Sequence, residues 1–206
     1  MTYSSGIGSI ILGVVVFLVV VILVTTGLRG YRWIRDHFLR TWIRSSVDGK
    51  YYHVLKSRYQ QQAADNLATI QQQMLAFVRQ LYINRGTFSP DIVPYIIRLH
   101  SRYHPDRTRL SEGIPDPKKS TFTLNKGESI TFCLAGEGMN QPYELNILVY
   151  VAIHELAHVG TPKQDHHGPE FQYLHAFLLK EAIRQRVYIP RDFSKNPVNY
   201  CNVHIG

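Results

Sequence analysis

Two histidines four residues apart, His154 and His158, lie in an apolar segment of this 206-residue chain, with Glu155 directly after the first. The surrounding residues 143–158 contain no Gly or Pro, and their apolar positions recur at helical spacing, which predicts a buried amphipathic helix. Side chains four residues apart share one face of a helix, so both imidazoles can reach a single metal ion. Glu155 lies about 100° further round the helix, where it could hold a water molecule at the ion instead of coordinating the ion.

A catalytic zinc ion usually has three protein ligands, and the residues after this helix offer candidates for the third. The helix is predicted to end at Gly160, and a short polar loop then leads to His167. Pro169 suits the first turn of a second helix that runs toward residue 186, which would place His167 just before that helix and pointing back at the first. We therefore expect His167 to be the third ligand. Three other donors remain open for this role: His166, Glu170 and Glu181.

The motifs H-E-L-A-H at residues 154–158 and H-G-P-E-F at residues 167–171 resemble those of the zincin metallopeptidases of the SprT-like and WLM families. Four further stretches, DGKYYHVL, AADNLATIQQQMLAFVRQL, LNKGESITFCL and DFSKNPVNYCNVHI, resemble a WLM-related group of predicted metallopeptidases of large eukaryotic DNA viruses. These stretches are spread along the whole of residues 48–206, so the resemblance extends over nearly all of this range. The resemblance implies one Zn²⁺ ion bound by His154, His158 and His167, with Glu155 as the catalytic residue.

The N-terminal part of the chain contains an uncharged apolar run. Residues 7–27 have the length needed to cross roughly 30 Å of hydrocarbon as a helix. They predict a transmembrane helix, preceded by a short extracytoplasmic N-terminus at residues 1–6. A cleaved signal peptide and a buried core helix are the alternatives. The residues before the run carry no basic side chain, and a core helix so uniformly apolar is unexpected in so small a domain. Residues 28–47 would form a basic juxtamembrane linker, and their positive charge predicts a single-pass protein whose C-terminal domain is cytoplasmic, in a host or virion membrane.

The charge distribution bears on the choice of partners. The chain has a net charge of +8, of which half lies in residues 1–50. The basic segment 29–50, together with residues 7–27, is therefore expected to contact membrane lipid. Residues 51–206 show no basic stripe with interleaved aromatic residues, so no nucleic-acid partner is expected. In a cytoplasmic domain Cys133 and Cys201 should stay reduced, whereas the opposite membrane orientation would allow them to form a bridge.

The remaining segments predict an α+β fold. Residues 57–82 and 90–103 have helical periodicity, and the polar residues 105–120 are predicted to be a loop. Apolar and polar residues alternate in residues 121–124 and 130–134, on either side of a turn. This pattern predicts a β-hairpin whose edge could hold an extended peptide. The residues after 190 are expected to form an irregular tail. The predicted architecture is an N-terminal transmembrane helix followed by a mostly helical zincin-like domain at residues 48–206 with a small antiparallel sheet.

These inferences predict a membrane-anchored zinc metallopeptidase. A water molecule activated by Zn²⁺ would attack a protein or peptide substrate, with Glu155 as the general base. Two alternatives remain open: a catalytically inactive zinc-binding structural or virion membrane protein, and a DNA-dependent protease. The second alternative ranks last because the net charge of residues 51–206 is modest. Nothing in the sequence predicts an oligomeric state.

Overall fold

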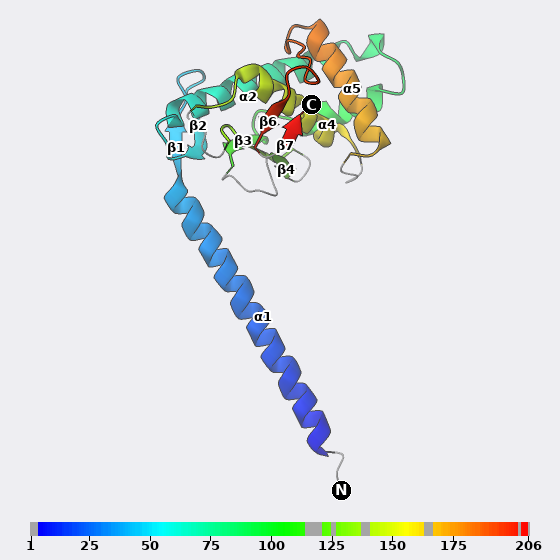
Figure 1. Cartoon of the computed structure of the whole chain (residues 1–206). Coiled ribbons are helices and arrows are strands. Elements are labelled where there is room, and N and C mark those ends of the chain that lie inside the picture. Colours follow the sequence, from blue (N-terminus) through cyan, green and yellow to red (C-terminus); the bar gives the residue numbers. More distant parts are fainter. Residues whose placement is uncertain are drawn as a thin grey trace. The chain divides into compact units, whose positions relative to one another are not determined.

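The computed structural model describes residues 4–113, 121–124, 127–136, 141–162, 167–201 and 203–205. The chain divides into two compact units, Met1–Arg40 and Thr41–Gly206. The first unit contains the helix α1 (Ser4–Leu39). The other elements follow it in the order β1 (Arg40–Arg44), β2 (Tyr51–Leu55), α2 (Gln60–Ile83), the short 3-10 helix η1 (Arg85–Thr87), α3 (Val93–Arg102), β3 (Arg109–Glu112), β4 (Phe122–Leu124), β5 (Ser129–Phe132), α4 (Leu145–Gly160), α5 (Pro169–Arg184), β6 (Val198–Tyr200) and β7 (Val203–Ile205) (Figure 1).

The prediction of a transmembrane helix over residues 7–27, and with it the single-pass membrane placement, is wrong. Among the residues that the structure describes, no helix combines the length and the apolar character required to span a bilayer.

Residues 28–47, expected to be a basic linker, contain the end of α1 and the strand β1. The turn after β1 is held by Asp65 of α2, which accepts hydrogen bonds from Ser45 Oγ at 2.7 Å, from the Ser46 amide at 2.7 Å and from Ser46 Oγ at 2.9 Å. Partial burial acts to raise the pKa of Asp65, but these bonds outweigh it and lower the pKa below its usual value. Within the second unit, the turn after β1 is thus anchored to α2.

The sheet differs from the predicted small antiparallel sheet, because its middle is parallel. Five strands are arranged in the order β1-β2-β3-β5-β4. The pairs β2–β3 and β3–β5 are parallel, and β4 pairs antiparallel with β5 as the predicted hairpin. The fold is therefore a mixed α/β fold. Strand β3 lies within the residues expected to be a loop. Its alternate residues Leu110 and Glu112 are buried. Because one of these two buried residues is charged, the segment lacks the apolar alternation by which a strand is predicted from sequence.

The predicted helices of the second unit are confirmed. They form α2, α3, α4 and α5, with boundaries within a few residues of those expected. Helix α2 packs on β2 and β3, α3 and α4 pack on α2 and on each other, and α4 also packs on α5 and β4. The resulting core contains large apolar side chains that are fully buried: Leu67, Ile70, Met74, Phe77, Leu81, Ile96, Leu99, Ile130, Phe132 and Leu148. Helix α4, which carries the H-E-x-x-H motif, lies in the middle of this core.

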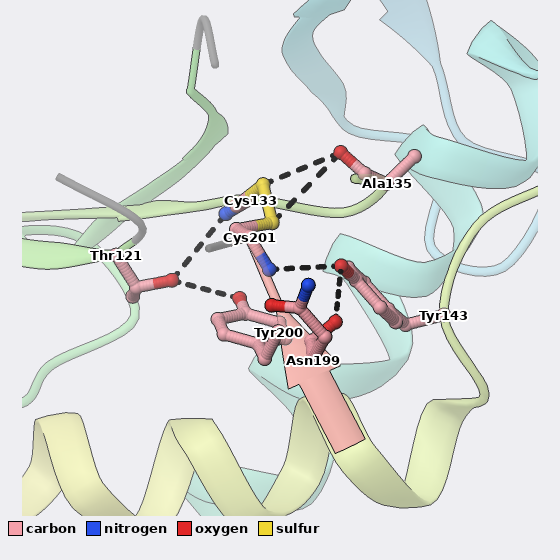
Figure 2. Close-up of a disulfide and its surroundings, with 7 residues drawn as sticks. All are labelled: Thr121, Cys133, Ala135, Tyr143, Asn199, Tyr200 and Cys201. Carbon is pink, nitrogen blue, oxygen red and sulfur yellow. Dashed lines mark hydrogen bonds between the residues drawn. A yellow bond between two sulfur atoms is a disulfide. The ribbon is translucent and has the colours of Figure 1, made fainter. Parts of the chain in front are cut away.

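The C-terminal residues form a β-hairpin, β6–β7, where an irregular tail was predicted. A disulfide bond between Cys133 and Cys201 attaches this hairpin to the residue that follows β5, with the two Cα atoms 6.4 Å apart (Figure 2). The expectation of reduced cysteines is therefore wrong. It depended on a cytoplasmic location, which in turn depended on the transmembrane helix that the structure does not contain among its described residues.

Candidate metal centre

Helix α4 places His154, Glu155 and His158 as their spacing predicts. The helix is buried along most of its length, and Leu156 and Ala157 between the two histidines are fully covered. This apolar packing fixes the backbone at His154 and His158, so that the rings lie on one face with centroids 5.0 Å apart. Burial on this scale limits how far the two imidazoles can move apart.

His167 joins these two histidines from the N-terminal side of α5. Gly168 is the N-cap of α5 and Pro169 occupies its first turn, so the chain reverses direction directly after His167. The ring of His167 lies 5.0 Å from that of His154 and 5.1 Å from that of His158. Each of the three residues offers one nitrogen, and these nitrogens all lie within 4.8 Å of one another. Among the described residues this is the one group of three that could hold a metal ion.

The geometry of the three histidines and the protonation state of His154 suit a metal ion. The Nε2 atoms of His154 and His167 lie 3.1 Å apart. Two nitrogen ligands of one tetrahedral ion, each about 2.0–2.1 Å from it, are separated by roughly 3.4 Å. Burial, followed by the neighbouring histidines, lowers the pKa of His154 to about 3, so its imidazole is neutral at pH 7. A neutral imidazole is the form that binds a metal.

Sequence reasoning missed two aromatic side chains of α5 that support the three histidines. Phe171 is 2% exposed, and its ring contacts those of His154, His158 and His167 at centroid distances of 4.8, 4.4 and 4.8 Å. His175 stacks on Phe171 at 5.6 Å and meets the edge of His154 at 5.3 Å. Their spacing of four residues on one helix is the signal that could have linked them.

The other candidate ligands lie differently. His166 falls outside the described residues. Glu170 is half-buried, its Oε2 atom receives no hydrogen bond from the described residues, and it does not belong to the three-nitrogen group. Glu181 is buried and engaged elsewhere, because Arg184 donates hydrogen bonds to it at 2.6–3.2 Å. The structure thus brings His167, rather than either glutamate, to His154 and His158.

Glu155 lies on the buried side of α4, next to the histidines. Its side chain is 3% exposed, and Thr123 of β4 donates a hydrogen bond from Oγ1 to Glu155 Oε2 at 2.5 Å. Burial raises the pKa of this carboxyl from its usual value of 4.5 to about 7, and the bond from Thr123 partly offsets the rise. A carboxyl that titrates near neutral pH is suited to accepting and donating a proton.

The C-terminal hairpin reaches the strand that carries Thr123. Tyr200 Oη and Thr121 Oγ1 lie 2.7 Å apart, and Tyr143 Oη accepts a hydrogen bond from the Cys201 amide at 2.9 Å (Figure 2). Burial is the main cause of a raised pKa at Tyr200, and the charge of Glu155 contributes to it. Tyr200 of the hairpin therefore lies close enough to Glu155 for the two side chains to interact electrostatically.

Gly160 is the last residue of α4, and the cap follows it at Thr161. A Cβ atom at Gly160 would lie 2.5 Å from Leu174 Cδ2, and Leu174 is fully buried. The glycine therefore allows the close approach of α4 to α5, which carries Phe171. Arg98 of α3 also donates a hydrogen bond to the Gly160 carbonyl at 3.2 Å, as expected of a cation near a helix C-terminus.

We expect Gly160→Ala to destabilise the protein. Helix propensity alone favours alanine by about 1 kcal/mol, whereas an extra carbon in a filled core costs about 1–3 kcal/mol. The contact with Leu174 should dominate, giving a net loss of about 1 kcal/mol in the free energy of unfolding, measurable by urea denaturation. Gly86→Ala is the matched control, because a Cβ atom there meets nothing within 4 Å. Equal stabilities of the two variants would contradict this account of Gly160.

Comparisons with known proteins found similarity to two uncharacterized viral proteins. No family model matches it, and no solved structure does so significantly. "Uncharacterized protein R325" of Acanthamoeba polyphaga mimivirus is 31% identical over 165 residues, which are 80% of this chain and 82% of that protein. "Uncharacterized protein 042R" of Invertebrate iridescent virus 3 is 35% identical over 86 residues, which are 41% of this chain and 51% of that protein. The length and identity of the first match show that the chain belongs to the family of the mimivirus protein R325.

Proposed function

We propose that the chain is a zinc-dependent hydrolase of peptide bonds. The observation that supports this most is the convergence of His154, His158 and His167 beside a buried glutamate, with 3.1 Å between the Nε2 atoms of His154 and His167. Three imidazoles are a donor set that suits zinc and leaves a fourth position for a water molecule or a substrate. The adjacent Glu155 is not needed as a ligand, and this favours a catalytic site over a purely structural one.

In this proposal each residue has one task. When bound, zinc supplies Lewis acidity, which polarises a carbonyl group and makes a water molecule acidic at neutral pH. The three histidines would hold the ion in place beside Glu155. Glu155 accepts the proton of the attacking water and passes it to the leaving amine. Thr123 bonds Oε2, so Oε1 is the carboxylate oxygen that would carry this proton.

The sheet edge beside the histidines suggests a peptide substrate. Among the described strands, β4 lies at the edge of the sheet and packs against α4. An edge strand has backbone N–H and C=O groups that an extended peptide can pair with. Because Thr123 of this strand contacts Glu155, a peptide bound along β4 would run past the proposed base. We therefore propose a protein or peptide in an extended conformation as the substrate.

A peptide-library digest tests the proposed function. The full chain, loaded with zinc, is incubated with a proteome-derived peptide library, and new termini are identified by mass spectrometry. We expect cleavage that a zinc chelator abolishes and added zinc restores. A protein that holds zinc but cleaves no peptide would contradict the proposal and would make the metal site a structural one.

A further inference from the structure

The hydroxyl of Thr123 makes the hydrogen bond that fixes the carboxylate of Glu155. Thr123 Oγ1 donates to Glu155 Oε2 at 2.5 Å, across 32 residues of sequence. Glu155 is almost completely buried, so bulk water has little access to compete for this bond. Among the described residues, Thr123 is the partner that the structure gives to this carboxylate. The orientation of Glu155 therefore depends on where strand β4 holds one hydroxyl group.

Strand β4 holds Thr123 firmly through its neighbour β5. Thr123 is the middle residue of the three-residue strand and pairs with Ile130, which is 1% exposed. A β-branched side chain such as threonine has few χ1 rotamers, so a fixed backbone also fixes the hydroxyl. Serine has the same hydroxyl but more rotamer freedom, which makes it a useful comparison.

The C-terminal hairpin anchors the residue just before β4. Thr121 lies two residues before Thr123, which in extended chain places both side chains on the same face. Its Oγ1 lies 2.7 Å from Tyr200 Oη and accepts a hydrogen bond from the Cys133 amide at 3.4 Å (Figure 2). Tyr200 directly precedes Cys201, which is bonded to Cys133. Contacts from the hairpin and from β5 thus hold the strand segment that carries Thr123.

We propose that Thr123 is a positioning residue for Glu155: its hydroxyl holds Oε2, which leaves Oε1 as the oxygen that acts as the base. This inference rests on the proposed function. The same strand would receive the substrate peptide, so the position of the peptide and the orientation of the base are set together by β4. A displacement of about 1 Å at a catalytic group can cost about 100-fold in rate. Thr123 acts through Glu155 and does not touch the reacting atoms.

The test compares Thr123→Val with Thr123→Ser in the full chain. Valine keeps the β-branched shape and removes the hydroxyl, whereas serine keeps the hydroxyl. We expect Thr123→Val to lower kcat by at least about tenfold with KM and zinc content unchanged, and Thr123→Ser to recover most of this loss. Thr131→Val on β5 is the matched control, because its buried hydroxyl faces Ser111 at 3.3 Å and not Glu155. This control should retain wild-type kcat.

A second readout does not depend on activity. In protein labelled with ¹³C at glutamate carboxyl groups, the Glu155 resonance is identified by its loss in Glu155→Gln. We expect it to shift in Thr123→Val and to return in Thr123→Ser. An unmoved resonance with unchanged kcat would overturn the inference, and Thr123→Ala gives the same comparison if valine prevents folding. If the wild type cleaves no peptide, the proposed function fails, yet the NMR comparison still decides whether Thr123 holds Glu155.

Discussion

Glu155→Gln is expected to lower kcat/KM for peptide hydrolysis by roughly 10²–10⁴-fold while leaving the zinc content unchanged. Glutamine has nearly the same shape as glutamate and can still accept the hydrogen bond from Thr123, but its amide cannot take a proton from water. Rates measured on a peptide from the library digest, together with metal analysis of the same samples, test this expectation. The rate should fall without loss of the metal.

Glu144→Gln is the matched control for this substitution. Glu144 is the N-cap of α4, is mostly exposed and pairs with Arg191 at 3.4 Å. It precedes Glu155 by about three helical turns, which is roughly 16 Å along α4. We expect this variant to keep the wild-type rate. Full activity in a zinc-loaded Glu155→Gln protein would rule out Glu155 as the base.

The zinc-free protein should show a pH effect from the same carboxyl. The pKa of Glu155 is about 7 in the fold and close to its usual 4.5 in the unfolded chain. The folded state thus holds the proton more tightly, so the free energy of unfolding falls as pH rises from about 4.5 to 7 and is level above that. The loss is on the order of 3 kcal/mol. Glutamine does not titrate, so Glu155→Gln does not show this pH-dependent loss. Above pH 7 the zinc-free variant should therefore be more stable than the wild type in urea denaturation.

The loss of the Cys133–Cys201 disulfide is expected to be the largest change in stability. The bond joins residues 68 apart in sequence and encloses both α4 and α5. Closing a loop of this length restricts the unfolded chain and contributes about 4 kcal/mol to the free energy of unfolding. The double variant Cys133→Ser with Cys201→Ser should lose about this amount. Denaturation of this variant, compared with the wild type with and without reductant, measures the effect.

Two controls separate the bond from the packing around it. The reduced wild type should have nearly the same free energy of unfolding as the double variant, because both lack the cross-link. Hydrogen exchange should rise first at the amide of Cys201, which donates to Tyr143 Oη at 2.9 Å in the intact hairpin. Two free thiols in the native, unreduced protein, detected by alkylation and mass spectrometry, would contradict the disulfide.

Local spacing was sufficient to predict the part of the site that lies on one helix. His154 and His158 share a face because four residues make about one helical turn, and α4 carries both as expected. His167 was also within reach of the sequence, because Gly168 and Pro169 mark the start of the next helix. These features depend on contacts between residues that are close in the chain.

Long-range contacts could not be predicted in this way. Thr123 reaches Glu155 across 32 residues, and the bond depends on the register of β4 against β5. Strand β3 enters the sheet by parallel pairing, which needs long connections and leaves no short turn motif in the sequence. Cys201 meets Cys133 because the tail folds into the hairpin β6–β7, where an irregular segment was expected.

The error at the N-terminus has a different origin. The prediction of a membrane span used hydropathy and length over residues 7–27. Among the described residues, however, no helix combines the length and the apolar character that a membrane span requires. The predicted cytoplasmic location and the predicted reduced cysteines both depended on that span. The disulfide between Cys133 and Cys201 contradicts the second of these expectations directly.

Metal analysis of the purified full chain is the most direct test of the proposed site. After reconstitution with zinc at neutral pH, mass spectrometry should find about one zinc ion per chain in the wild type. His167→Ala should lose the metal, because His167 supplies one of the three converging nitrogens, whereas His166→Ala should keep it. A wild type without zinc, or a His167→Ala protein that binds it as fully as the wild type, would contradict the three-histidine site.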